Sequence, residues 1–205
     1  ERGQSRTDPG QLALVSTTRL LDRLQRLRDA GEVRLDEADQ LELRIDPGQV
    51  RRDARIRQDV ERLLDKLVRV VKAPLMIDST DAKVMERALT WCQGKSILNS
   101  INLEDGLARF EKVVPLGRRF GAAFVVGLID ETGMAVTVER KLEVARRSYR
   151  ILTEEMAVAP EDIWWDPLVF PCGTGDEAYL GSAAATIAGV RAVKAEFPLT
   201  KTILG

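Results

Sequence analysis

From residue 74 onward, short apolar runs alternate with longer segments of helical period, and this alternation limits the folds that the chain can adopt. The runs are rich in β-branched residues and occupy 74–79, 95–100, 122–130, 162–170 and 201–205. Strands separated by helical segments of this length pair in parallel, because a parallel connection needs a crossover helix. The sequence therefore predicts an α/β fold with a parallel sheet.

Three helical stripes lie between the predicted strands. Their apolar positions are Val84, Ala88 and Trp91; Val138, Leu142, Ala145, Tyr149 and Leu152; and Leu180, Ala184, Ile187 and Val190. Each stripe predicts a helix that covers one face of the sheet with its apolar side.

The first 73 residues carry a less regular version of the same pattern. Residues 12–15 and 40–45 are candidate strands, and a helical stripe follows at Ile56, Val60, Leu63, Leu64, Leu67 and Val71. This makes seven candidate strands, one fewer than a closed eight-stranded (β/α)8 barrel needs. Because 205 residues suit one domain, we predict a single domain over 1–205: a TIM-type barrel that lacks its last βα unit, with 1–73 as divergent first units.

The competing architecture is an open, doubly wound sheet. Such a sheet usually has a glycine-rich phosphate turn after its first strand. Here that position reads Ser16, Thr17 and Thr18. We therefore favour the barrel.

Charge and cysteine content exclude several classes of function. Lys and Arg number 31 against 32 Asp and Glu, so we expect no nucleic-acid partner. The sequence has no histidine, and Cys92 and Cys172 lie far apart, so neither a zinc site nor a disulfide framework is expected. Free cysteines suit the cytoplasm, and no apolar run approaches the roughly 20 residues of a membrane span.

Polar side chains recur where the predicted strands end. They are Asp78, Asn99 with Asn102 just beyond it, Asp130 and Asp166. In a parallel barrel the carboxyl ends of all strands share one rim, which holds the active site. These side chains are therefore expected to converge on a ligand.

A polar residue at a strand end often serves only as the N-cap of the next helix. Here other residues can fill that position, namely Thr80 or Asp81, Asp105 or Asn102, and Thr137. Most of the polar residues at the strand ends are therefore not needed as N-caps and are available to bind a ligand.

Carboxylates on an apolar rim suit a planar ligand with adjacent N–H donors, because one carboxylate accepts two parallel hydrogen bonds. Pterins and guanine both have such an edge. The amide of Asn99 can donate and accept, as a mixed edge requires. A Mg²⁺ site made of carboxylates alone is the remaining alternative.

Five segments resemble a known family in order and spacing. They read APLMIDSTDAKVMERAL, GKSILNSINLEDG, FGAAFVVGLIDETGMAVT, PEDIWWDPLVFP and KTILG. These segments of 74–205 resemble the folate-binding barrel of cobalamin-dependent methionine synthases. They are also similar to the methyltetrahydrofolate:corrinoid methyltransferases and, more distantly, to the dihydropteroate synthases.

The resemblance implies a methyltransferase domain that binds N5-methyltetrahydrofolate and presents its methyl group to cob(I)alamin held on a partner domain. In such a domain Asp78 of I-D-S-T, Asn99 of N-S-I-N and Asp166 of D-P-L hydrogen-bond the pterin, with Asn102 and Asp130 as further candidates. Asn99 and Asp166 would be the catalytic residues. The chain itself would bind no metal.

Two other functions remain open. A dihydropteroate synthase-like enzyme would need basic residues near the last strands, but Lys201 begins a strand and should point away from the rim. The second open possibility is a module that binds a pterin or another protein without catalysing a reaction.

Overall fold

The computed structural model describes residues 61–69, 71, 73–171, 173 and 177–205. Both candidate strands within 1–73 lie outside this part of the chain. The single domain over 1–205 and its number of strands therefore stay predictions. Residues 61–69 are helical, in agreement with the stripe expected there.

Five parallel strands form the sheet, close to the five predicted runs. They are β1 (Met76–Asp78), β2 (Ile97–Leu103), β3 (Ala123–Asp130), β5 (Ile163–Asp166) and β6 (Lys201–Thr202). Their spatial order follows their sequence order, β1-β2-β3-β5-β6. A doubly wound sheet reverses its strand order at one point, whereas this order is that of a barrel wall. A short strand that the sequence did not predict, β4 (Gly133–Met134), pairs antiparallel with β3.

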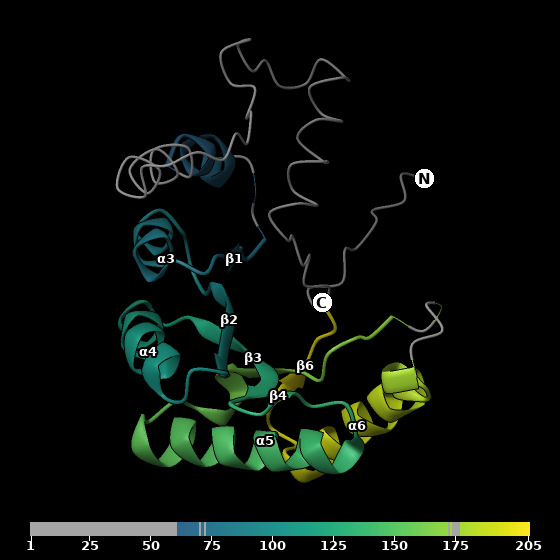
Figure 1. The fold of residues 1–205 in the computed structure, drawn as a ribbon. Coiled ribbons are helices and arrows are strands. Elements are labelled where there is room, and N and C mark those ends of the chain that lie inside the picture. Colours follow the sequence, from purple (N-terminus) through teal and green to yellow (C-terminus); the bar gives the residue numbers. More distant parts are fainter. Residues whose placement is uncertain (1–60, 70, 72, 172, 174–176) are drawn as a thin grey trace, which may run out of the picture.

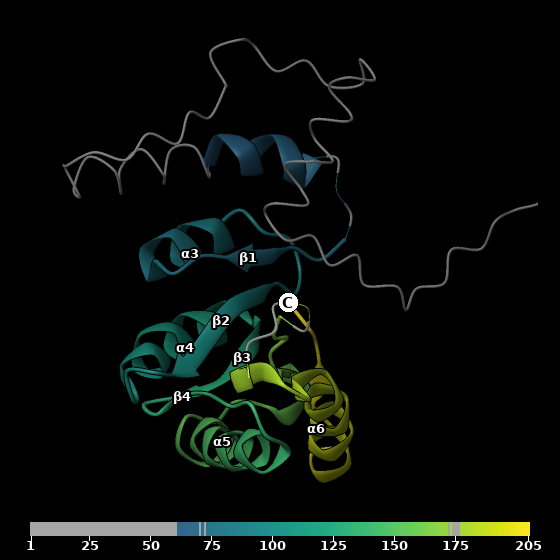
Figure 2. The ribbon, with the colours of Figure 1, turned by 45° about the vertical axis from the view of Figure 1, so that its right-hand side comes forward.

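The helices lie in an arc on one side of the sheet (Figures 1 and 2). They are α3 (Ala82–Leu89), α4 (Ala108–Phe120), α5 (Val138–Arg150) and α6 (Ser182–Glu196). Two of the expected N-caps are confirmed: Asp81 accepts a hydrogen bond from the Lys83 amide at 2.8 Å, and Thr137 accepts one from the Arg140 amide at 3.3 Å. Helix α4 instead has Leu107 at its N-cap and no side-chain cap, so the third cap prediction was wrong.

The sheet has two buried faces. Its outer face, toward the helices, carries the larger core, to which Leu98, Phe124 and Trp165 belong. Its inner face carries a smaller cluster that consists of Met76, Ile97, Ala123, Val125 and Trp164, with Ile203 packed against it. Trp164 and Trp165 therefore face opposite ways, as expected for adjacent strand residues.

Helix α6 exists where predicted, but the prediction of its buried face was wrong. Leu180 is 88% exposed and Ile187 57% exposed. The buried positions are instead Ser182, Thr186, Gly189 and Val193. The physical reason is the close approach of α5: a Cβ atom on Gly189 would lie 2.5 Å from Cδ of Lys141, so only a small residue fits between the helices.

Candidate functional site

The polar residues at the ends of β1 and β2 lie side by side on the inner face. The parallel register pairs Asp78 with Asn99. Each comes two positions after a residue of the inner cluster, Met76 or Ile97, and side chains two apart share a face. Asp78 is exposed and Asn99 half-buried. Both side chains are therefore available above an apolar inner layer.

Asn102 reaches the same face because β2 is irregular. The pairing with β3 shifts between Leu98 and Ile101, and both of these residues belong to the outer core. Asn102 follows Ile101 and so turns inward. A Cβ on Gly127 of β3 would lie 3.8 Å from the Asn102 Cβ, and the Asn102 Oδ1 accepts a hydrogen bond from the Glu104 amide at 3.1 Å.

Asp166 of β5 lies on the same inner face as Asp78, Asn99 and Asn102. We call these four side chains the inner row. Asp166 is paired with Gly127 and lies two positions after Trp164. The Leu168 amide donates to its Oδ1 at 3.0 Å, and the Gly205 amide also donates to its carboxylate. Burial raises the pKa of the Asp166 carboxyl group, and these amides with the charge of Lys141 partly oppose that effect.

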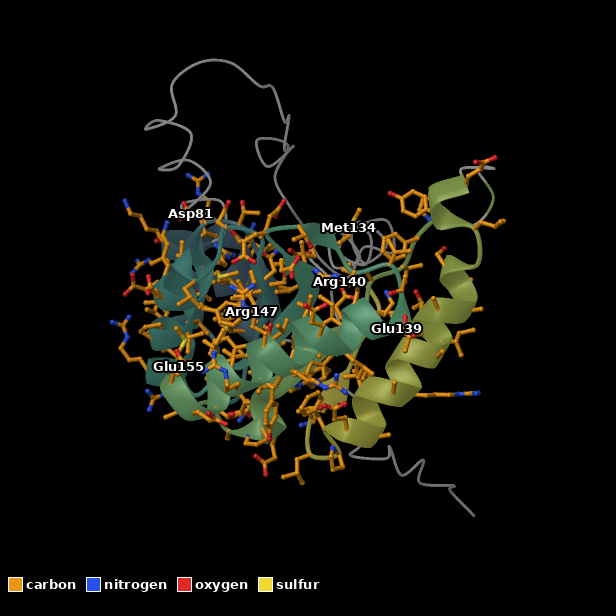
Figure 3. All side chains as sticks on the ribbon, turned by 60° about the horizontal axis from the view of Figure 1, so that its bottom comes forward. Asp81, Met134, Glu139, Arg140, Arg147 and Glu155 are labelled. Carbon is orange, nitrogen blue, oxygen red and sulfur yellow. The ribbon has the colours of Figure 1, made fainter. Side chains whose placement is uncertain are left out.

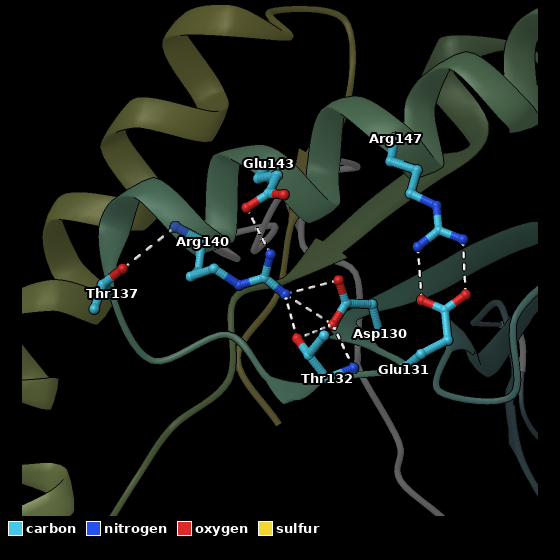
Figure 4. A network of polar contacts seen from close by, with 7 residues as sticks. All are labelled: Asp130, Glu131, Thr132, Thr137, Arg140, Glu143 and Arg147. Atoms are coloured by element: carbon cyan, nitrogen blue, oxygen red, sulfur yellow. Dashed lines mark hydrogen bonds and ion pairs between the residues drawn. The ribbon is translucent and has the colours of Figure 1, made fainter.

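Asp130 does not join this row, contrary to the expected convergence. It shares its side of β3 with Phe124, Val126 and Leu128, so it faces the helices. Figure 4 shows its carboxylate turned toward Arg140 of α5. Arg140 Nη2 donates to Asp130 Oδ2 at 2.7 Å and Oδ1 at 2.8 Å.

The surroundings of Asp130 keep it charged. Burial alone would raise the pKa of its carboxyl group, but hydrogen bonds from Thr132 and Arg140 outweigh burial and lower the pKa. The neighbouring Glu131 forms a two-bond ion pair with Arg147, at 2.6 and 2.7 Å. Arg140 and Arg147 extend from the same side of α5 (Figures 3 and 4). The two pairs fasten α5 to the turn after β3.

Arg109 of α4 binds the backbone that directly follows Asp78 and Asn99. Its guanidinium donates to the carbonyl oxygen of Ser79 at 2.9 Å, to that of Ser100 at 3.2 Å, and to that of Thr80. Ser79 directly follows Asp78, and Ser100 directly follows Asn99. One half-buried cation therefore fixes the backbone next to two residues of the inner row.

Lys141 of α5 is a second cation on the helix side of the sheet, and it binds backbone near the ends of β4 and β5. Its side chain is fully buried. The ammonium donates to the carbonyl oxygens of Ala135 and Pro167, both at 2.6 Å, and lies 5.0 Å from the centre of the Phe170 ring. Burial lowers the pKa of Lys141 to about 8.

Sequence reasoning missed Lys141 and Arg109. A signal for Lys141 was present, because it lies three residues before Val144 and four before Ala145, on the apolar side of α5. A lysine at such a position must find partners for its charge. Arg109 gave no comparable signal, since its acceptors are backbone carbonyl oxygens that lie 9 to 30 residues earlier in the chain.

The described part of the chain offers no group of three or more His, Cys, Asp or Glu residues that could hold a metal ion. In the same residues, no helix is long and apolar enough to cross a membrane.

Sequential parallel strands backed by outer helices define a barrel-type α/β domain, and Asp and Asn side chains line the inner face of its sheet. Residues 45–202 match the family described as pterin binding enzyme, and the chain belongs to this family of TIM-type barrels. It resembles the methionine synthase of Mycobacterium leprae (strain TN), with 37% identity over 150 residues. These residues are 72% of this chain and 12% of that protein.

Proposed function

We propose that this chain binds N5-methyltetrahydrofolate and presents its methyl group for transfer to cob(I)alamin held on another domain. The observation that carries the proposal is the inner row of Asp78, Asn99, Asn102 and Asp166. Membership of the pterin binding enzyme family supports the ligand class. The similarity to a methionine synthase supports the reaction.

The row suits the chemistry of a pterin. The ring is flat, and one edge carries adjacent N–H donors that a carboxylate can accept in pairs. Asp78 and Asp166 supply carboxylates from different strands, and Asn99 supplies an amide for the mixed edge. The apolar layer below them, which includes Met76 and Trp164, suits the face of a ring.

Methyl transfer requires N5 to leave as a neutral amine, so it must gain a proton or a strong hydrogen bond during the reaction. Asn99 and Asp166 are the residues we assign to orienting and polarising the pterin for that step. The corrinoid supplies the nucleophilic cobalt.

A dihydropteroate synthase-like reaction has less support. It would need basic residues at the rim near the last strands. Lys201 instead donates to the Glu161 carbonyl oxygen at 2.6 Å, beside the residues that precede β5. This is the amino end of the sheet, away from the inner row.

The proposal is tested by titrating the chain with methyltetrahydrofolate. Asp78→Asn and Asp166→Asn should each weaken binding by about 2 to 4 kcal/mol, because each removes a charged acceptor from a partly desolvated contact. Asp81→Asn is the matched control. It makes the same change three residues from Asp78, and asparagine still serves as an N-cap.

Affinities of both variants within about twofold of the parent, or equal weakening by Asp81→Asn, would remove the support for this assignment. A parent chain that binds no folate would contradict the proposed function itself.

A further inference from the structure

We propose that Lys141 is a positioning residue of the pterin site: its ammonium holds the turn Asp166–Leu168 and supplies a compensating positive charge beneath the Asp166 carboxylate. This inference rests on the proposed function, because Asp166 is taken as a ligand of the pterin. It adds a residue on the outer side of the sheet that contacts no ligand and acts through Asp166.

The first step is the conformation of the turn. Leu168 has φ of +66°, in the left-handed region that residues with a side chain rarely adopt. Such a conformation persists only where its surroundings hold it. The turn also directs the Leu168 amide at Asp166 Oδ1, so its conformation and the orientation of the carboxylate are linked.

The second step is what holds the turn. Lys141 donates to the carbonyl oxygen of Pro167, the middle residue, at 2.6 Å. Thr186 of α6 donates to the carbonyl oxygen of Leu168 at 2.9 Å. Two helices thus fix two consecutive carbonyl groups directly after Asp166. Of these two donors, only Lys141 is charged.

The third step is that a buried lysine is costly unless its charge serves an interaction. The described residues provide no salt bridge to Lys141; the charged group that acts on it there is Asp166. The other elements that contact it present uncharged groups, namely Gly189 of α6, the Ala135 carbonyl and the Phe170 ring.

The fourth step is electrostatic. Burial favours the neutral form of Asp166, and the charge of Lys141 favours the ionised form. Only the ionised carboxylate accepts two hydrogen bonds without offering a proton. Removal of the Lys141 charge should therefore raise the pKa of Asp166 and narrow the pH range over which a pterin is bound.

The test compares Lys141→Met, which keeps an unbranched apolar stem and removes the charged ammonium group, with Val144→Ala. Val144 is 1% exposed and lies on the same side of α5, so its truncation destabilises the helix packing without touching the turn. Methyltetrahydrofolate affinity is measured as a function of pH at a temperature where all chains are folded. Lys141→Gln is the second variant, because it removes the charge but keeps a polar donor.

We expect Lys141→Met to weaken binding about tenfold at neutral pH and to move the acid limb of the binding profile upward by about one pH unit. Lys141→Gln should move the acid limb in the same direction. Val144→Ala should leave both the affinity and the profile at parent values.

A parent-like acid limb in both lysine variants, with the parent chain binding normally, would overturn the inference and leave the proposed function intact. A parent chain that does not bind methyltetrahydrofolate would instead overturn the proposed function, and the inference with it.

Discussion

Asp130 and Asp166 end adjacent strands, yet their carboxyl groups have opposite properties. Asp130 faces an arginine and has a lowered pKa, whereas Asp166 faces inward and has a raised pKa. The difference comes from the side of the sheet each occupies, because the outer side offers cations from α5 within ion-pair distance. We infer a structural role for Asp130 and a binding role for Asp166.

Asp130→Asn tests that division. Loss of the charge weakens the two contacts with Arg140, so the free energy of unfolding should fall by about 1 to 3 kcal/mol. Chemical denaturation at pH 7 measures this change. Methyltetrahydrofolate affinity should stay at the parent value, since the side chain lies on the outer face. A large loss of affinity in a fully folded variant would return Asp130 to the binding site.

The stability of the chain should depend on pH through Lys141. Its pKa of about 8 in the folded chain lies below the ordinary 10.5, so the unfolded chain binds more protons between these values. Stability contributed by this group should therefore rise as the pH increases from about 8 to 10.5. Denaturation curves of the parent and Lys141→Met across this window measure the effect. Parallel curves for the two chains would argue against a depressed pKa.

At the scale of elements, the five strands were predictable because β-branched runs bounded by helical segments have few other interpretations. The orientation of each residue was harder to predict. Both faces of β3 are buried, so its sequence shows no alternation of apolar and polar residues. The side occupied by Asp130 could not be read from it.

Helix α6 was misread for a different reason. The pattern of Leu180 and Ile187 predicted the buried face, but the partner of α6 is α5, whose buried Lys141 takes up the space that an apolar side chain would fill. Apart from Val193, the buried residues of α6 are accordingly small or polar. A sequence taken alone does not show which neighbour a helix meets.

Gly117 of α4 provides a prediction at this scale. A Cβ there would lie 2.3 Å from the Phe124 ring, which is buried in the outer core. Gly117→Ala should therefore destabilise the chain by about 1 to 3 kcal/mol, although alanine is the better helix former. Thermal unfolding measures the change. If the clash is the cause, adding Phe124→Leu should cost less than the two single changes summed.

For the whole molecule, the proposed function predicts that the chain needs an external methyl acceptor. Incubated with methyltetrahydrofolate, it should release little tetrahydrofolate until cob(I)alamin is added. Asp166→Asn should then slow the transfer about a hundredfold, as is typical for the loss of one contact that stabilises a transition state. Asp81→Asn serves again as the control. Rapid turnover in the absence of any corrinoid would contradict this reaction.

Under the proposed function, the two faces of the sheet carry different tasks, and this separation bears on how such a domain can be changed. The side chains that would meet a ligand point inward, whereas Arg109 and Lys141 bind backbone carbonyl groups next to them from the helix side. Backbone acceptors are the same whatever residue occupies the position. A designer seeking a new specificity could therefore vary the inward positions by directed evolution and leave the scaffold of outer cations untouched.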